Sequence, residues 1–127
     1  SKTSGEGRSY QILVVDDEEE ILGILRDMIQ LKGHRVPAMS DGKKALEVIR
    51  EAEFDLILTD LGMPDISGWE IARQAKERNP KVPVILITGW GAQYEDDDLT
   101  ERGVDLVLSK PFSWDRLLEA MAKMLPH

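Results

Sequence analysis

The chain has 127 residues, which is enough for one domain with a sizeable hydrophobic core. Hydrophobic residues make up 42% and charged residues 31%, as in ordinary globular domains, and no apolar run is long enough to insert into a membrane as a spanning helix. Cysteine is absent, which excludes disulfides and thiolate metal sites, and a net charge of −8 argues against direct nucleic-acid contact. No signal-peptide pattern opens the sequence, so we expect a cytoplasmic location.

The sequence divides into a short polar start and one folded domain. Residues 1–9 are rich in Gly and Ser, which predicts a flexible linker or tag remnant, and residues 10–127 form the domain. Short apolar runs predict five strands, at residues 12–15, 34–40, 56–59, 84–88 and 104–108. Amphipathic stretches predict helices between and after them, at about residues 21–33, around 45–49, and at about 67–78, 94–102 and 113–125.

Local signals refine these elements. Pro37 cannot donate to a ladder, so the weak second strand belongs on a sheet edge. Ser40, Ser67 and Ser113 are the predicted N-caps of the second, third and last helices, and Ser67 has capping-box spacing with Glu70. In the last helix, the side chains expected to face the core are Leu117, Leu118, Met121, Met124 and Leu125.

Strands that alternate with helices predict an α/β fold, with right-handed crossovers and a parallel sheet covered on both faces. In such sheets, ligands bind beyond the carboxyl ends of the strands, near the switch in strand order. Five polar residues lie at or just past those ends, namely Asp16, Asp17, Asp60, Thr88 and Lys110. We therefore expect their side chains to converge on one site.

The residue types at this expected site suit phosphoryl chemistry. Carboxylates held close together repel one another and have raised pKa values, and a bound divalent cation removes that repulsion. Oxygen ligands without cysteine favour Mg²⁺ or Mn²⁺ over zinc. A carboxylate can act as a nucleophile that forms an aspartyl phosphate, while a metal ion and a lysine stabilise the charge of the transferring group.

Each of these residues has a plainer interpretation when it is taken alone. The acidic run at residues 16–20 is also a favourable helix start, and Asp60 is also a candidate loop cap. Thr88 is a common strand residue, and Lys110 by itself is an ordinary surface lysine. Their joint placement at one sheet edge is what favours a functional site.

Four motifs, in this order, carry a resemblance to a known family: "VVDDE", "DLILTDLGMPDISG", "ILITG" and "LSKPF". Together they resemble the receiver domain of bacterial two-component response regulators, over about residues 10–125. The resemblance implies a flavodoxin-like, doubly wound sheet of five parallel strands in the order 2-1-3-4-5, with helices on both faces.

The resemblance also implies a metal site. Asp16 and Asp17 correspond to the acidic pair of the family, with Asp17 as the usual direct ligand. Asp60 and the backbone carbonyl of Gly62 correspond to the other protein ligands of Mg²⁺.

The same resemblance implies roles in phosphoryl transfer. Asp60 corresponds to the phospho-acceptor, and Thr88 to the hydroxyl that follows the phosphoryl group. Lys110 corresponds to the phosphate-binding lysine, whose bond to Pro111 is typically cis.

The sequence departs from the family pattern at one position that matters for signalling. Val107 stands where the fifth strand usually carries the Tyr or Phe that rotates with the threonine. We therefore expect the signal to run instead through residues 89–102, whose helix is rich in Asp and has Leu99 as its one clear aliphatic anchor. Trp90, two residues after Thr88, is expected to change its exposure on phosphorylation.

The function implied by the resemblance is a phosphorylation-dependent switch rather than an enzyme with its own substrate. A histidine kinase or histidine phosphotransfer domain would donate the phosphoryl group to Asp60. The fourth helix, fifth strand and fifth helix would then present a face to an output domain or partner protein, and a homodimer is compatible with this. The "ITGWG" stretch and the leading linker favour the receiver of a hybrid histidine kinase, while a stand-alone regulator and the front of a transcription factor remain alternatives.

Three other functions compete with this interpretation. A phosphatase similar to haloacid dehalogenases would have a second Asp two residues after the nucleophile, where this chain has Gly62. A flavodoxin-like cofactor carrier would need a Thr-, Ser- or Gly-rich turn after the first strand, where "DDEEE" would repel phosphate. A receiver-like module that binds partners without phosphorylation would not need the complete set of acidic residues, threonine and lysine.

Overall fold

The computed structural model describes residues 8–89 and 93–126, so most of the predicted linker and Trp90 lie outside the described residues. The strands are β1 (Ile12–Val15), β2 (Ala38–Met39), β3 (Leu56–Asp60), β4 (Val84–Thr88) and β5 (Leu106–Ser109). The helices are α1 (Glu19–Leu31), α2 (Gly42–Glu51), α3 (Gly68–Arg78), α4 (Asp96–Glu101) and α5 (Trp114–Met124).

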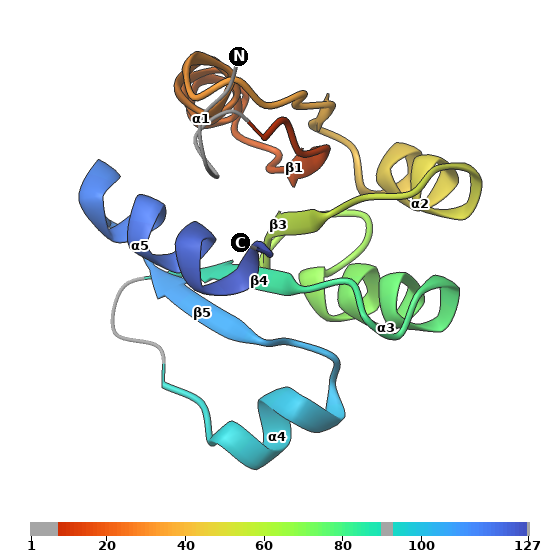
Figure 1. Ribbon diagram of the computed structural model, residues 1–127. Coiled ribbons are helices and arrows are strands. Elements are labelled where there is room, and N and C mark those ends of the chain that lie inside the picture. Colours follow the sequence, from red (N-terminus) through yellow and green to blue (C-terminus); the bar gives the residue numbers. More distant parts are fainter. Residues whose placement is uncertain (1–7, 90–92, 127) are drawn as a thin grey trace.

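The five strands form one parallel sheet in the order β2-β1-β3-β4-β5, which confirms the predicted fold class (Figure 1). Every residue of β1, β3 and β4 is buried. These strands lie in the middle of the sheet with helices over both faces, which explains why their sequences are continuous apolar runs instead of alternating ones.

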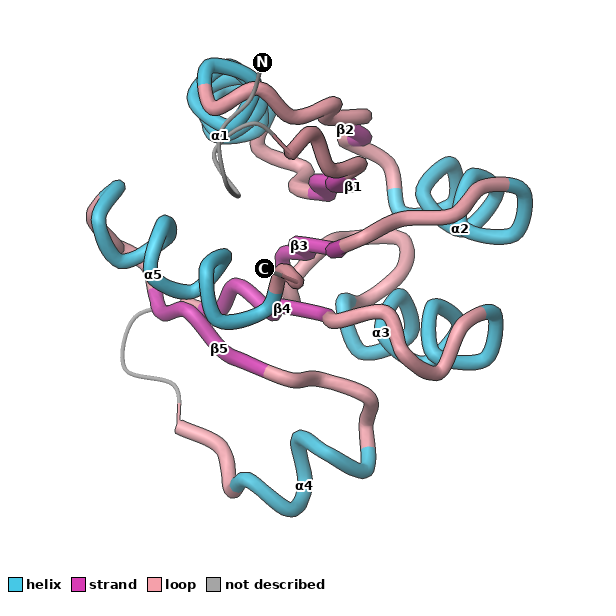
Figure 2. Tube along the Cα trace, viewed as in Figure 1, coloured by secondary structure: helices cyan, strands magenta, loops and turns pink. Residues whose placement is uncertain are grey.

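Two hydrophobic cores lie on the two faces of the sheet. One packs α1 and α5 against strand side chains that include Ile12, Leu58 and Ile85. The other packs α2 and α3 against side chains that include Leu13, Ile57 and Leu86. Figure 2 shows this division, with α1 and α5 on one side of the strands and α2 and α3 on the other. Successive side chains along each strand point to opposite faces of the sheet, so each strand contributes to both cores.

Two of the three predicted helix caps are confirmed and one is wrong. Ser67 accepts a hydrogen bond from the backbone N–H of Glu70, and Ser113 accepts one from that of Arg116. The second helix is capped by Asp41, whose Oδ1 lies 2.8 Å from the nitrogen of Lys43. The predicted N-cap was Ser40, but the helix begins one residue later than expected. The carboxylate of Asp41 accepts a hydrogen bond from the first turn as well as a serine hydroxyl would.

The edge elements are shorter than their sequences predicted. β2 has two residues at the sheet edge, although the Pro37 carbonyl still accepts a hydrogen bond from Val14 at 3.0 Å. α4 has six residues, none of them buried, and three consecutive Asp residues form its first turn. In the last helix, Leu118 is only half-buried, and among the residues that the structure describes it belongs to neither core, contrary to the prediction.

Within the described residues, no helix combines the length and the apolar character that crossing a bilayer requires.

Candidate functional site

The register of the sheet brings the carboxyl ends of four strands together. β1 pairs with β3 through Val15 and Thr59, so Asp16 and Asp17 follow β1 beside the place where Asp60 ends β3. Thr88 ends β4 and pairs with Ser109, one residue before Lys110. The strand pattern predicted this convergence, because parallel strands deliver their carboxyl ends to one edge.

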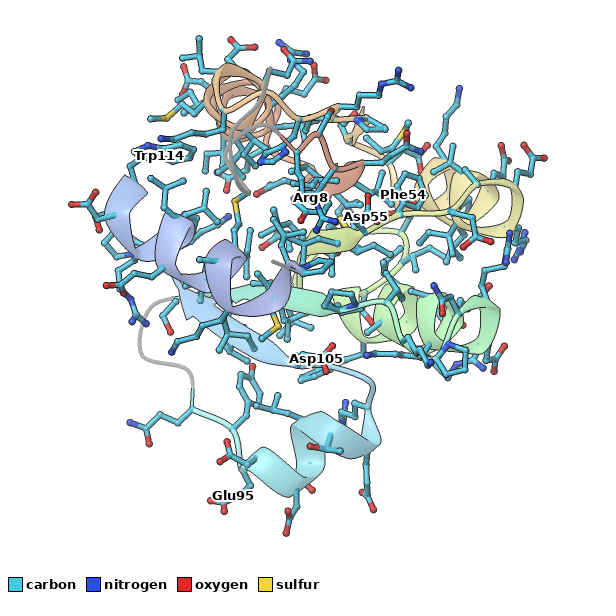
Figure 3. The ribbon with its side chains drawn as sticks, viewed as in Figure 1. Arg8, Phe54, Asp55, Glu95, Asp105 and Trp114 are labelled. Carbon is cyan, nitrogen blue, oxygen red and sulfur yellow. The ribbon has the colours of Figure 1, made fainter. Side chains whose placement is uncertain are left out.

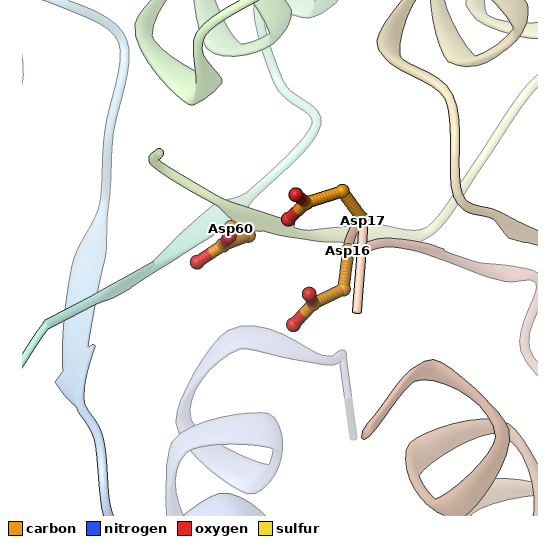
Figure 4. A group of neighbouring side chains, drawn as sticks. All are labelled: Asp16, Asp17 and Asp60. Carbon is orange, nitrogen blue, oxygen red and sulfur yellow. The ribbon is translucent and has the colours of Figure 1, made fainter. Parts of the chain in front are cut away.

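Three carboxylates meet at this edge (Figure 4). One oxygen from each of Asp16, Asp17 and Asp60 lies within 4.8 Å of the others. Asp16 is 0% exposed and Asp60 is 7% exposed. Burial raises the pKa of both Asp16 and Asp60, and the charge of Asp16 raises that of Asp60 further, while Lys110 opposes both shifts. The cluster therefore carries negative charge that the protein only partly neutralises.

Lys110 is the cation of the site. Its Nζ lies 3.4 Å from Oδ2 of Asp16 and 3.5 Å from Oδ1 of Asp60. It also donates a hydrogen bond to Oε1 of Glu18 at 3.0 Å. Burial alone would lower the pKa of Lys110, but the hydrogen bond to Glu18 and the charges of Asp16 and Asp60 raise it overall, so the ammonium stays charged. The bond from Lys110 to Pro111 is cis, as the resemblance implied.

Thr88 supplies a hydroxyl at the same edge. The residue is 1% exposed, and among the described residues its Oγ1 has no hydrogen-bond partner. Its backbone carbonyl accepts a hydrogen bond from the backbone N–H of Lys110 at 2.9 Å, which connects the end of β4 to the lysine. A buried hydroxyl without a partner is costly, which indicates a place where a ligand atom would complete the bonding.

The donor set fits a hard divalent cation. In the part of the chain that the structure describes, Oδ2 of Asp16 is buried and accepts no hydrogen bond. Three converging carboxylates supply the oxygen ligands that Mg²⁺ or Mn²⁺ takes, although Oδ2 of Asp16 already has Nζ of Lys110 at 3.4 Å as a neighbouring cation. Gly62 lies in an exposed turn two residues after Asp60, and its role as a carbonyl ligand stays a prediction.

Two residues of the site were not found by sequence reasoning. In the sequence, Glu18 is distinguished only as part of an acidic run, yet its side chain accepts a hydrogen bond from Lys110. Gly68 lies where an added Cβ would overlap the carbonyl oxygen of Asp60 and come within 2.8 Å of Leu86, and its N–H donates to the Leu61 carbonyl at 2.9 Å. The "DISG" stretch held the signal for Gly68, since a glycine at a helix start permits close backbone approach.

Val107 and the aromatic residues near α4 make their contacts with α3 and the core beside it. Val107 is half-buried and packs against the core that contains α2 and α3. Trp69 of α3 has Tyr94 edge-on at 5.4 Å between ring centroids, and the Arg102 guanidinium lies 4.4 Å from its ring centroid. Trp69 is therefore one of the contacts that join the α4 region to α3, and Gly103 lies against Lys76 and Ala72 of the same helix.

A doubly wound parallel sheet of this order, with acidic residues and a lysine at its carboxyl edge, defines a flavodoxin-like α/β domain. Residues 12–122 match the family model of the response regulator receiver domain. The chain belongs to this family, whose members are regulatory domains of two-component signalling proteins.

Known relatives agree with this membership. The chain is 33% identical over 121 residues to the transcriptional regulatory protein ZraR of Klebsiella oxytoca. This alignment covers 95% of the chain but only 27% of ZraR. The chain is 30% identical over 116 residues to the polar-differentiation response regulator DivK of Brucella ovis, covering 90% of this chain and 94% of DivK. The domain therefore resembles both a part of a longer regulator and nearly the whole of a short one.

A solved relative shares the fold. The response regulator TrrA of Thermotoga maritima, determined in complex with Mg²⁺ and BeF, superimposes with a TM-score of 0.79 and 32% identity, covering 91% of this chain and 99% of TrrA. The agreement over nearly the full length of both chains confirms the predicted receiver fold.

Proposed function

We propose that this receiver domain is a phosphorylation-dependent switch that takes a phosphoryl group from a phosphohistidine onto Asp60. The donor is a histidine kinase or a histidine phosphotransfer domain, and the setting is the cytoplasm. The observation that carries the proposal is the convergence of Asp60 with Asp16, Asp17 and Lys110, since Lys110 lies 3.5 Å from the acceptor oxygen and the carboxylates lie within 4.8 Å of one another.

The chemistry assigned to Asp60 is nucleophilic. A carboxylate oxygen forms a bond to the phosphorus atom, the bond between phosphorus and the imidazole nitrogen breaks, and that nitrogen leaves with the electron pair. The products are an aspartyl phosphate and the histidine of the donor. Lys110 stabilises the negative charge of the transferring group, and the free hydroxyl of Thr88 donates a hydrogen bond to one of its oxygens.

The metal has a defined part in this proposal. Mg²⁺, or Mn²⁺ in its place, supplies positive charge that offsets the repulsion between the acidic cluster and the incoming phosphoryl group. Asp16, Asp17, Asp60 and the carbonyl of Gly62 would hold it. The raised pKa values of Asp16 and Asp60 support this assignment, because burial and neighbouring carboxylates disfavour the charged forms and a bound cation would offset both effects.

The output is assigned to the face formed by α4, β5 and α5, through which an attached domain, a partner protein or a second copy would read the switch. α4 is the weakest part of that face, because none of its six residues is buried and Asp is a poor helix former. Figure 3 shows the side chain of Glu95, just before α4, pointing away from the body of the domain. A segment held by few contacts is easily rearranged when Thr88 follows a phosphoryl group.

The proposal is tested by incubating the full chain with acetyl phosphate and Mg²⁺ and measuring the mass of the intact protein by mass spectrometry. We expect the wild type and an Asp65→Asn control to gain one phosphoryl group and Asp60→Asn to gain none. An Asp60→Asn variant that is modified as fast as the wild type would contradict the assignment of the acceptor.

A further inference from the structure

Glu18 connects the acidic cluster to the lysine in an unexpected way. It occupies the N-cap position of α1, yet within the described residues its side chain caps no N–H of that helix. The side chain instead accepts a hydrogen bond from Nζ of Lys110 at 3.0 Å. Its backbone N–H donates to Oδ1 of Asp16 at 2.9 Å. The backbone carbonyl of Glu18 still accepts the first hydrogen bond of the helix, from the N–H of Leu22 at 2.9 Å, but its side chain and its N–H are both engaged in the site.

The distances show which carboxylate holds the lysine. Lys110 is closer to Glu18, at 3.0 Å, than to Asp16 at 3.4 Å or Asp60 at 3.5 Å. The contact with Glu18 is the one that also meets hydrogen-bond geometry. The ammonium is therefore bound by a residue that belongs neither to the acceptor nor to the predicted metal ligands.

The exposure of these groups places Glu18 at the mouth of the site. Its side chain is 60% exposed, whereas that of Lys110 is 23% exposed and that of Asp16 is fully buried. An anion that reaches Asp60 must attract the same ammonium that Glu18 holds. The carboxylate of Glu18 also repels that anion by its own charge.

We propose that Glu18 is a positioning residue that holds Lys110 in the resting domain and competes with the phosphoryl group for it. This inference rests on the proposed function. Phosphorylation or beryllofluoride binding requires Lys110 to leave Glu18. The carboxylate of Glu18 therefore raises the concentration of phosphoryl donor at which phosphorylation of the domain is half-maximal. Glu18 thereby limits phosphorylation by small, weakly bound donors, while a bound kinase can overcome the competition.

The test compares Glu18→Gln with Glu19→Gln in the full chain. Glu19 is the next residue, is exposed in the first turn of α1, and forms no hydrogen bond to Lys110 within the described chain, so it controls for the loss of one charge. Fluorine NMR measures beryllofluoride binding at saturating Mg²⁺, and mass spectrometry measures the rate of phosphorylation at several acetyl phosphate concentrations. Glu18→Ser, which keeps a good N-cap, serves as a second variant if Glu18→Gln folds poorly.

For Glu18→Gln and Glu18→Ser we expect tighter beryllofluoride binding, and half-maximal phosphorylation at lower acetyl phosphate, each by about two- to fivefold, the range expected for an exposed ion pair. Glu19→Gln should match the wild type. A maximal rate that changes while the half-maximal concentration does not would overturn the inference, as would unchanged or weaker binding.

Double substitution separates competition for the lysine from simple charge repulsion. In a Lys110→Gln background, the added Glu18→Gln change should raise beryllofluoride affinity by clearly less than it does in the wild-type background, because only the direct repulsion by Glu18 remains. An equal gain in both backgrounds would show that Glu18 acts by its charge alone, which contradicts the inference. If the wild type and Glu19→Gln themselves neither bind beryllofluoride nor become phosphorylated, the proposed function fails as a whole, and that outcome is distinct from a failure confined to Glu18.

Discussion

Gly68 lies directly against the carbonyl oxygen of Asp60, with no room between them for a side chain. A Cβ at position 68 would also approach the Cα of Leu61 to 2.9 Å, so two of its three nearest neighbours belong to backbone that cannot rotate away. The first turn of α3 therefore holds the residue proposed as acceptor in place by backbone packing.

This contact predicts that Gly68→Ala destabilises the domain by about 1–3 kcal/mol, the usual cost of forcing extra atoms into a packed site. The measurement is the free energy of unfolding in urea. Gly62→Ala is the matched control, because nothing lies within 4 Å of a Cβ at that position. Equal stability of the two variants would show that the loop after β3 yields without cost.

Mg²⁺ should stabilise the folded domain, because the acidic cluster exists only in the native state. At a hundredfold excess over the dissociation constant, the expected gain is about 2.7 kcal/mol. Asp17→Asn should lose most of this response, whereas Asp27→Asn, an exposed carboxylate of α1, should keep it. The measurement is the melting temperature during a titration to millimolar Mg²⁺. A wild type that responds to neither Mg²⁺ nor Mn²⁺ would remove the metal site.

His34 should make stability depend on pH in a defined window. Its Nδ1 accepts a hydrogen bond from the Tyr10 N–H at 3.2 Å, and burial lowers its pKa from 6.5, while the charge of Asp55 opposes the shift. The folded state therefore binds fewer protons than the unfolded chain. The stability contributed by neutral His34 is complete above 6.5 and declines as the pH falls below that value toward the lower folded pKa.

The variant His34→Asn tests this window, because its side-chain oxygen can accept the same hydrogen bond without titrating. Between about pH 7.5 and about pH 5 the wild type should lose more unfolding free energy than the variant, by about 1 kcal/mol or less. Parallel pH profiles of the two proteins would contradict the account of His34.

The α4 region should respond most strongly to activation. Leu99 packs partly against the core, and Trp69 contacts Tyr94 and Arg102, but no residue of the helix is fully buried. We expect beryllofluoride with Mg²⁺ to change amide hydrogen exchange at residues 93–102 more than in α1, and to have no effect on Asp60→Asn. Exchange that changes in β5 while residues 93–102 stay unaltered would contradict this route.

The sequence predicted the central fold well because buried parallel strands leave a strong pattern. β1, β3 and β4 begin as continuous apolar runs, and polar or charged residues at or just past their carboxyl ends are brought together by the sheet. The elements at the sheet edges were predicted less well. β2 and α4 are short and bury little, so few apolar residues mark their bounds.

The residues that sequence reasoning missed depend on three-dimensional contacts. Asp41 and Ser40 are both good N-caps, and only the backbone path decides that Asp41 is used. Glu18 and Lys110 are 92 positions apart, so their hydrogen bond has no local sequence signal. Gly68 reveals its importance only when α3 is packed against the end of β3.

The position of the phosphoryl group can be determined chemically. After reaction with acetyl phosphate and Mg²⁺, borohydride converts an aspartyl phosphate to homoserine, which tandem mass spectrometry assigns to a position. We expect homoserine at position 60, with Asp55 and Asp65 on either side unchanged. Homoserine at either of those flanking positions, or at none, would contradict it.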